Sequence, residues 1–267
     1  SETCAFDLVE AVFVRELDPG EIVSIGPDGI KSIQTSPATR RAFCIFEFIY
    51  FARPDSTFYG QNVYLTRKAH GRRLAQEAPV EADFVMPFPD SGTYAALGYS
   101  EASGIPFEMG MIRNHYVGRT FIQPTQSMRD FGVRIKLNPV KNLLKGKDII
   151  IIEDSIIRGT TVRTRVKALR ELGVRKVHMR VSGPPHRFPC HYGIDFSTRG
   201  ELIAARKTVE ELREFLGLDS LYYLSIDGLL KATEFKSPET NFCKACFDGC
   251  YPVAFDKQLT KSCLESD

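Results

Sequence analysis

Two adjacent carboxylates, Glu153 and Asp154, directly follow the four isoleucines at residues 149–152. Neighbouring like charges repel each other, so this pair is best tolerated where a cation or a hydroxyl-rich ligand binds. The sequence Arg-Gly-Thr-Thr at 158–161 then leads into a helical pattern. Free backbone N–H groups, the helix dipole and two hydroxyls at such a helix start favour a phosphate. One short segment therefore offers a site for a metal ion or diol beside a site for phosphate, and a phosphorylated ribose carries both groups.

The elements around these residues predict where they lie. The isoleucine run is typical of a parallel strand that is buried on both faces. From residue 160 the apolar residues recur at helical spacing, at Val162, Val166, Leu169 and Leu172. Ligands of open α/β sheets bind at the carboxyl ends of strands, where the two acids are expected. A simpler alternative is that Asp154 or Ser155 caps the helix while Glu153 is solvated.

Composition limits the possible classes of protein. The 267 residues are enough for one large or two small domains, and a net charge of +2 gives no argument for nucleic-acid or anionic-membrane binding. No apolar run approaches a membrane span, and the sequence begins without a recognisable secretory signal. Seven scattered cysteines do not resemble a secreted disulfide framework. We therefore expect a cytoplasmic protein whose thiols are free or bound to metal.

The order of predicted elements changes along the chain. Residues 1–40 are predicted to be β-rich, with strands at 11–17 and 21–26 and a turn at 27–29. Later segments alternate between strands and helices, with helices at 66–78, 93–104, 160–172 and 208–218, and strands at 83–88, 106–112, 149–152 and 176–182. This alternation predicts an α/β fold with a central parallel sheet covered by helices.

Several motifs together resemble a known family. The segment "DIIIIEDSIIRGTT" resembles the 5-phosphoribosyl 1-pyrophosphate (PRPP) signature of type I phosphoribosyltransferases, in the form found in amidophosphoribosyltransferases. The stretches "SETCAFD", "YFARPDS", "VMPFPDSGTYAALGYSEASGIP", "NHYVGRTFIQP", "FPCHYGID" and "CKACFDGCYP" extend the resemblance in family order over almost the whole chain. It implies the type I phosphoribosyltransferase fold and the first step of de novo purine (IMP) synthesis. That step forms 5-phosphoribosylamine and pyrophosphate from PRPP and glutamine-derived ammonia.

The resemblance also implies roles for individual residues. Glu153 and Asp154 would hold the ribose hydroxyls and Mg²⁺, although Glu153 stands where the family usually has Asp, which leaves its role in metal binding open. The loop that wraps the 5-phosphate would contribute Ser155, Arg158, Gly159, Thr160 and Thr161. Asp90 and Ser91 match the pyrophosphate loop, with Ser91 also near Mg²⁺. Taken without the second loop, Asp90 or Ser91 reads as an ordinary helix N-cap.

A long basic connection at 113–139 is a candidate lid. Loops beyond about 12–15 residues are usually lids or disordered segments, and a solvated basic loop is the simpler alternative. A lid over a polyanionic substrate fits better, because pyrophosphate must be shielded as it departs. "NHYVGRTFIQP" resembles the family's catalytic flexible loop, in which Tyr116 and Arg119 act at the closed site, while His115 replaces a frequent Arg.

The cysteines raise a second question of chemistry. The pair Cys243-x-x-Cys246 indicates metal only if two further ligands exist, and zinc and iron–sulfur clusters both use four cysteines. Four unrelated thiols are the simpler alternative. The resemblance implies that Cys44 and Cys190 complete a [4Fe–4S] site, found in one branch of the family, that fastens the C-terminal tail. Cys250 could compete with Cys246 as a ligand.

The resemblance divides the chain into three parts. Residues 1–40 match the end of a glutaminase domain of the Ntn-hydrolase type, 41–236 a phosphoribosyltransferase domain, and 237–267 a cysteine-rich tail. Most of the glutaminase would lie outside this chain, which alone could at most use ammonia. The resemblance further implies feedback inhibition by purine nucleotides and a homo-oligomer, a tetramer. Two other classes stay open: a purine or orotate salvage phosphoribosyltransferase, and a non-catalytic PRPP-binding regulator.

Overall fold

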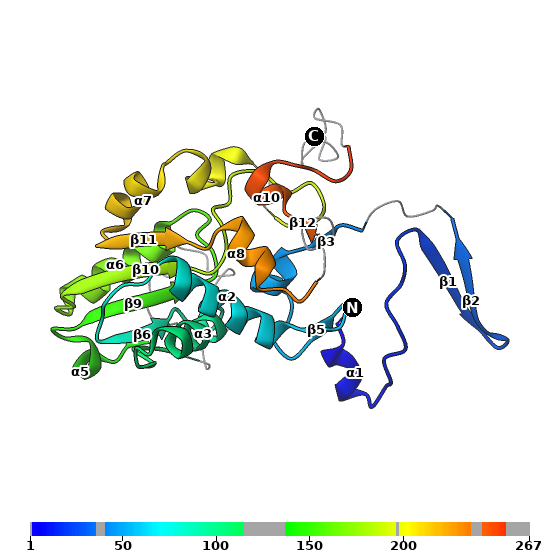
Figure 1. Cartoon of the computed structure of the whole chain (residues 1–267), viewed down its shortest axis with the longest axis horizontal. Coiled ribbons are helices and arrows are strands. Elements are labelled where there is room, and N and C mark those ends of the chain that lie inside the picture. The colour runs from blue at the N-terminus through cyan, green and yellow to red at the C-terminus, as the bar shows by residue number, and fades with distance from the viewer. Residues whose placement is uncertain (1, 36–40, 115–136, 196–197, 236–241, 255–267) are drawn as a thin grey trace, which may run out of the picture.

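A computed structural model describes residues 2–35, 41–114, 137–195, 198–235 and 242–254. Within these ranges the largest sheet has four strands in the order β11-β10-β9-β6, and every neighbouring pair is parallel (Figure 1). Its members are β6 (Phe84–Pro87), β9 (Asp148–Glu153), β10 (Lys176–Val181) and β11 (Ser220–Tyr223). The predicted central parallel sheet is therefore confirmed.

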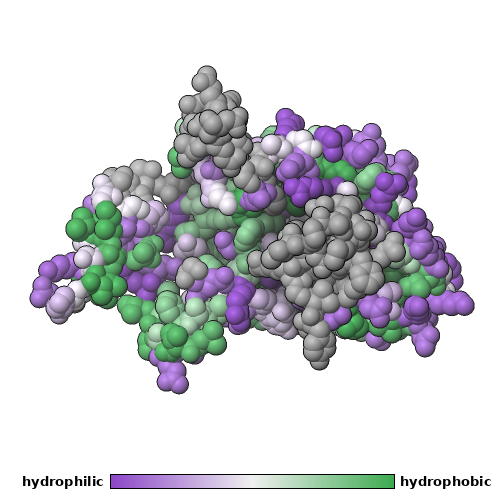
Figure 2. Space-filling view, turned by 180° about the vertical axis from the view of Figure 1, so that it is seen from behind, coloured by the Kyte–Doolittle hydropathy of each residue, from purple (hydrophilic) through white to green (hydrophobic). Residues whose placement is uncertain are grey.

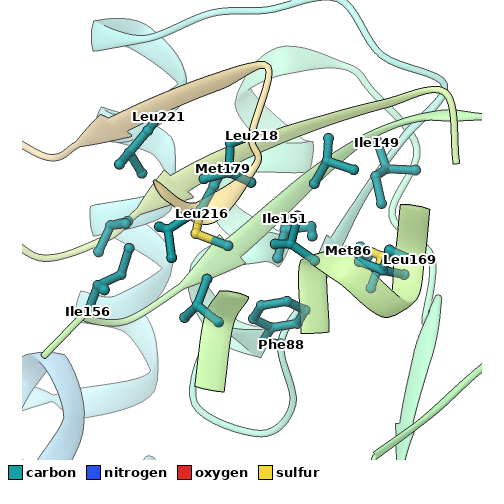
Figure 3. Close-up of a cluster of buried hydrophobic side chains, with 14 of the residues drawn as sticks. Met86, Phe88, Ile149, Ile151, Ile156, Leu169, Met179, Leu216, Leu218 and Leu221 are labelled. Carbon is teal, nitrogen blue, oxygen red and sulfur yellow. The ribbon is translucent and has the colours of Figure 1, made fainter. Parts of the chain in front are cut away.

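Helices cover both faces of this sheet (Figure 1). One face packs against α2 (Val63–Glu77), α3 (Thr93–Ser103) and α8 (Ile226–Lys231), and the other against α6 (Thr160–Glu171) and α7 (Val209–Leu216). Side chains of β9 alternate between the two cores. Ile150 and Ile152 belong to the first core, and Ile149 and Ile151, which Figure 3 labels, belong to the second. This alternation explains why the strand is apolar throughout and confirms the burial predicted from the isoleucine run.

The remaining described elements are short connections around this body. They are β3 (Phe43–Cys44), the π-helix η1 (Glu47–Phe51), β4 (Thr57–Phe58), β5 (Gln61–Asn62), β7 (Met111–Arg113), β8 (Leu137–Pro139), α5 (Lys141–Leu144), η3 (Arg199–Glu201), η4 (Ile203–Ala205), β12 (Phe242–Cys243) and α10 (Ala245–Asp248). None of the helices in the described ranges has the length and apolar character needed to cross a bilayer.

Two predicted strands differ from the structure. Residues 11–17 form no regular element, because nothing in the described chain pairs with them and strand propensity without a neighbour is weak. The strand expected at 106–112 is interrupted. Phe107 makes an isolated parallel bridge to Val85, and only β7 continues, in an antiparallel pair with β8. The chain therefore leaves the edge of β6 before a full strand forms.

The N-terminal part contains a helix and a hairpin. Helix α1 (Cys4–Leu8), which the sequence did not indicate, precedes the antiparallel strands β1 (Glu21–Gly26) and β2 (Gly29–Gln34), joined by the turn predicted there. The hairpin lies away from the α/β body (Figure 1). Its exposed apolar residues are Ile22, Ile25, Ile30 and Ile33. Hydrophobic residues gather at this end of the molecule (Figure 2), as is typical of a surface that another protein segment covers.

Candidate active site and cysteine cluster

A cavity of about 750 Å³ lies at the carboxyl ends of β6 and β9. Its volume falls within the range of about 300–1,000 Å³ that is usual for small-molecule sites. Five of the predicted substrate-binding residues line it: Asp90, Ser91, Glu153, Asp154 and Ser155. The structure thus brings the two loops together on one cavity, which the sequence could suggest only as separate motifs.

The loop after β6 is held against the end of β9. The backbone amide of Phe88 donates to the carbonyl oxygen of Ile152 at 2.9 Å. A Cβ atom at Gly92 would lie 2.2 Å from that same oxygen, so a glycine is needed where the two backbones meet. Asp90, in the same loop, forms an ion pair with Arg113 at the end of β7.

Glu153 and Asp154 are both buried, but they differ in their hydrogen-bond partners. Glu153 is 9% exposed and Asp154 is 3% exposed, and burial raises the pKa of both carboxyls. The hydroxyls of Ser155 and Ser91 donate to Asp154 and act to lower its pKa. Glu153 Oε2, by contrast, is buried and has no hydrogen-bond partner among the described residues. A buried carboxylate oxygen without a partner suits a cation or a ligand hydroxyl.

The donor set fits Mg²⁺ that arrives with a phosphorylated substrate. Carboxylate and hydroxyl oxygens are hard ligands, and Mg²⁺ is usually held by one or two carboxylates together with substrate phosphates. Within the described ranges, no three His, Cys, Asp or Glu side chains gather closely enough to hold a metal ion by themselves. Binding of Mg²⁺ by Glu153 and Asp154 stays a prediction.

Arginines add positive charge to the same cavity, which Arg53, Arg67, Arg113 and Arg165 line. Arg67 of α2 is 4% exposed, and its guanidinium donates to the carbonyl oxygens of Phe48 at 3.0 Å and Ala52 at 2.8 Å. Burial lowers its pKa. Sequence reasoning did not single out Arg53, Arg67 or Arg165 as site residues. The helical spacing could have indicated Arg165, because this residue lies at the border of the apolar face of the helix predicted at 160–172.

The predicted phosphate loop lies beside the cavity. Gly159 precedes α6 with a φ of +74°, a conformation that favours glycine, and a Cβ there would lie 3.0 Å from Ile203. Arg158 is exposed and pairs with Glu201 at 3.1 Å. Thr160 and Thr161 are exposed in the first turn of α6, and none of the four is among the residues that line the cavity. Their contact with phosphate stays a prediction.

The predicted catalytic residues Tyr116 and Arg119 lie outside the described residues, as does His115. The flanking segments are described up to residue 114 and from residue 137, where β7 and β8 pair. Because Arg113 at the end of β7 lines the cavity, the connection begins at the site.

The four predicted cluster ligands line a second, smaller cavity: Cys44, Cys190, Cys243 and Cys246. Cys44 and Cys243 lie opposite each other in the parallel pair of β3 and β12. Cys246 belongs to α10, and Cys190 lies in the loop that follows β10. Cys250 is exposed and is not among the residues that line this cavity.

The burial of these thiols affects how they would bind a metal. Burial raises the pKa of Cys44 to about 12 and also raises the pKa of Cys243 and Cys246, so burial favours the protonated form of these three thiols. Metal binding would release these protons. Zinc and iron–sulfur clusters both use four cysteine ligands. The four thiols line one cavity, and a [4Fe–4S] cluster bound to them stays a prediction.

Comparison with known proteins gives a consistent result. No family model matches the chain. An amidophosphoribosyltransferase of Synechococcus elongatus is 53% identical over 264 residues, which cover 99% of this chain and 53% of that protein. The enzyme of the same name from Bacillus subtilis is 52% identical over 255 residues, covering 95% of this chain and 54% of that protein.

Solved structures agree with this result. The glutamine PRPP amidotransferase of B. subtilis, complexed with ADP and GMP, matches with a TM-score of 0.89 and 49% identity over 96% of this chain and 57% of that one. A structure described as the allosteric regulatory enzyme of purine biosynthesis also has a TM-score of 0.89, with 49% identity over 97% of this chain and 56% of that one. The chain spans about half the length of the curated relatives it matches. It belongs to the amidophosphoribosyltransferase family.

Proposed function

We propose that this chain is the phosphoribosyltransferase portion of an amidophosphoribosyltransferase that joins ammonia to C1 of PRPP. The products are 5-phosphoribosylamine and pyrophosphate, in the first step of purine synthesis. The observation that carries the proposal is the convergence of Asp90, Ser91, Glu153, Asp154 and Ser155 on one cavity at the ends of two parallel strands. The names of the relatives support it.

The geometry supports a reaction without a covalent enzyme intermediate. Glu153 and Asp154 would accept hydrogen bonds from the ribose hydroxyls and fix the ring. The nitrogen lone pair of ammonia attacks C1 as the bond from C1 to pyrophosphate oxygen breaks, with inversion at C1 and loss of one proton from nitrogen. Mg²⁺, when bound, would offset charge on the departing pyrophosphate. Such positioning can lower a barrier by about 7–11 kcal/mol.

Cations and the loops would complete the site. Arg53 and Arg113 line the cavity and would offset the negative charge of pyrophosphate. The start of α6, with Arg158, Gly159, Thr160 and Thr161, would bind the 5-phosphate through backbone N–H groups and hydroxyls. Tyr116 and Arg119 would close over the substrate and exclude water.

The wider assignments also form part of this proposal. Residues 1–40 would belong to a glutaminase domain, 41–236 to the transferase domain and 237–267 to a tail fastened by a [4Fe–4S] cluster on the four cysteines. Glutamine would supply ammonia through the rest of the glutaminase. Purine nucleotides would act as feedback inhibitors, as ADP and GMP bound to the B. subtilis relative suggest. We further propose a homotetramer in a reducing cytoplasm.

Ammonia-dependent release of pyrophosphate from PRPP and Mg²⁺ tests the reaction in the intact protein. Asp154→Asn should reduce turnover by about 10²–10³-fold, because it removes a charge that the transition state requires, while the circular dichroism spectrum stays unchanged. Asp28→Asn, in the exposed hairpin turn, is the matched control and should keep full activity. Near-normal turnover by Asp154→Asn would contradict the assignment. Turnover only with a purine or orotate base would indicate a salvage phosphoribosyltransferase. Binding of PRPP without turnover would indicate a regulator.

A further inference from the structure

Arg165 reaches from α6 into the wall of the candidate active site. Its side chain is 24% exposed, and its guanidinium carbon lies 4.9 Å from the ring centroid of Phe88. Phe88 is fully buried beside the end of β6, so the ring is a fixed surface beneath the cation (Figure 3). Nη1 of Arg165 lies 3.9 Å from Oε2 of Glu153.

This distance has a specific consequence. At 3.9 Å the two groups attract each other electrostatically, but the separation is too long for a hydrogen bond. Glu153 Oε2 is the buried oxygen that has no hydrogen-bond partner within the described chain. Arg165 therefore offsets the charge of Glu153 and leaves the hydrogen-bonding capacity of this oxygen to a ligand.

The two carboxyl groups interact with each other, and each also has a different neighbour. Asp154 accepts hydrogen bonds from Ser155 and Ser91, which hold its carboxylate in place. Glu153 has one more methylene group than an aspartate, and its carboxylate lies near Arg165 of α6. An aspartate at 153 would end farther from the guanidinium of Arg165, so the contact depends on the glutamate.

We infer that Arg165 is a positioning residue that holds the carboxylate of Glu153 toward α6 and offsets its charge, so that this longer acid can serve at the ribose and metal position. The role of Glu153 at the ribose and metal position rests on the proposed function. The coupling between the side chains of Glu153 and Arg165 does not depend on it. Glu153 and Arg165 then form one functional unit, and changes to the two residues should not be additive.

A double-mutant cycle in the intact protein tests the inference. Arg165→Met should raise the KM for PRPP about tenfold at saturating Mg²⁺ and ammonia, with a smaller change in kcat, because coupled neighbours show interaction effects of this size. Arg165→Lys, which keeps the charge, should recover most of the loss. In the Glu153→Asp background, Arg165→Met should change KM less than about threefold.

Arg163→Met is the matched control. Arg163 lies on the same helix with its guanidinium over the ring of Phe215 at 4.6 Å, but it does not line the cavity. Its replacement should leave KM within about twofold of the original value, as for surface changes generally. The inference is overturned if Arg165→Met behaves like Arg163→Met, or if its effect is equal in both backgrounds.

A ligand-independent readout separates this inference from the proposed function. If the original protein does not turn over PRPP, the proposed function fails, and urea unfolding then decides the inference. Arg165→Met should lower the unfolding midpoint more in the original protein than in the Glu153→Asp background. Equal shifts in the two backgrounds would show that the side chains are not coupled.

Discussion

The backbone amide of Phe88 and the carbonyl oxygen of Ile152 form a 2.9 Å hydrogen bond that joins the two loops of the candidate active site. The bond lies where β6 and β9 end side by side. It places Ser91 within hydrogen-bonding reach of Asp154, although the two residues come from different loops. Main-chain contact therefore helps to set how the two loops lie relative to each other.

Gly92→Ala should separate these loops. Its Cβ atom would lie 2.2 Å from the carbonyl oxygen of Ile152, a backbone atom that cannot move aside easily. We expect a loss of about 1–3 kcal/mol in the free energy of unfolding, as for overpacking elsewhere, together with weaker PRPP binding. Urea denaturation and titration calorimetry would measure the two effects. Gly200→Ala is the control, since no atom lies within 4 Å of its added Cβ. Unchanged stability of Gly92→Ala would refute the steric account.

Arg67→Met should destabilise the wall of the cavity. The guanidinium of Arg67 donates to the carbonyl oxygens of Phe48 and Ala52 and so fixes η1 against α2. Its loss leaves these buried acceptors without their partner, and we expect a cost of about 3 kcal/mol in the free energy of unfolding. Chemical denaturation would measure it. Arg72→Met, on an exposed position of the same helix, should cost less than about 0.5 kcal/mol. Equal effects of the two changes would argue against the structural role.

Cys190→Ser should remove iron and acid-labile sulfide from protein purified without oxygen. Serine leaves the cavity with three thiols, and iron–sulfur clusters of this type require four cysteine ligands. Cys250→Ser is the control, because Cys250 is not among the residues lining that cavity, and it should keep the full iron content. Unchanged iron in Cys190→Ser, or equal loss in both variants, would show that the proposed ligand set is wrong. Zinc in place of iron would exclude the cluster.

His70 should make the fold sensitive to acid. Burial, with a contribution from Arg67, lowers the pKa of His70 to about 3, against about 6.5 for an unfolded histidine. Below pH 6.5 the unfolded state binds more protons than the folded state, so stability falls as the pH decreases toward the folded pKa. Between about pH 3 and pH 6.5, this histidine lowers the free energy of unfolding by up to about 1.4 kcal/mol for each unit by which the pH decreases. Above about pH 6.5 it has no such effect.

His70→Leu tests this sign. The replacement removes both the titrating group and a buried Nε2 atom that has no hydrogen-bond partner in the described chain. Urea unfolding between pH 5 and 7.5 should then show a shallower decline of stability toward acid than in the original protein. An unchanged slope in His70→Leu would show that His70 does not titrate on unfolding.

Much of the framework follows from local patterns in the sequence. The isoleucine run, the helical spacing after residue 160 and the turn at 27–29 predict β9, α6 and the hairpin turn correctly, because burial and backbone geometry act over a few residues. The strand predicted at 11–17 is wrong and the one at 106–112 is only partly formed. Strands depend on partners that lie elsewhere in the chain, so a local pattern is insufficient for them.

Local patterns and the family resemblance were enough to identify the chemical groups: two adjacent carboxylates, two loops with phosphate-binding character and four candidate cysteine ligands. Which of these groups lie together depends on the packing of distant elements. Parallel pairing of β3 with β12 places Cys44 opposite Cys243, and the packing of α6 on the sheet places Arg165 behind Glu153. These contacts depend on how distant elements pack in space. The periodicity of a single segment carries no information about its distant neighbours.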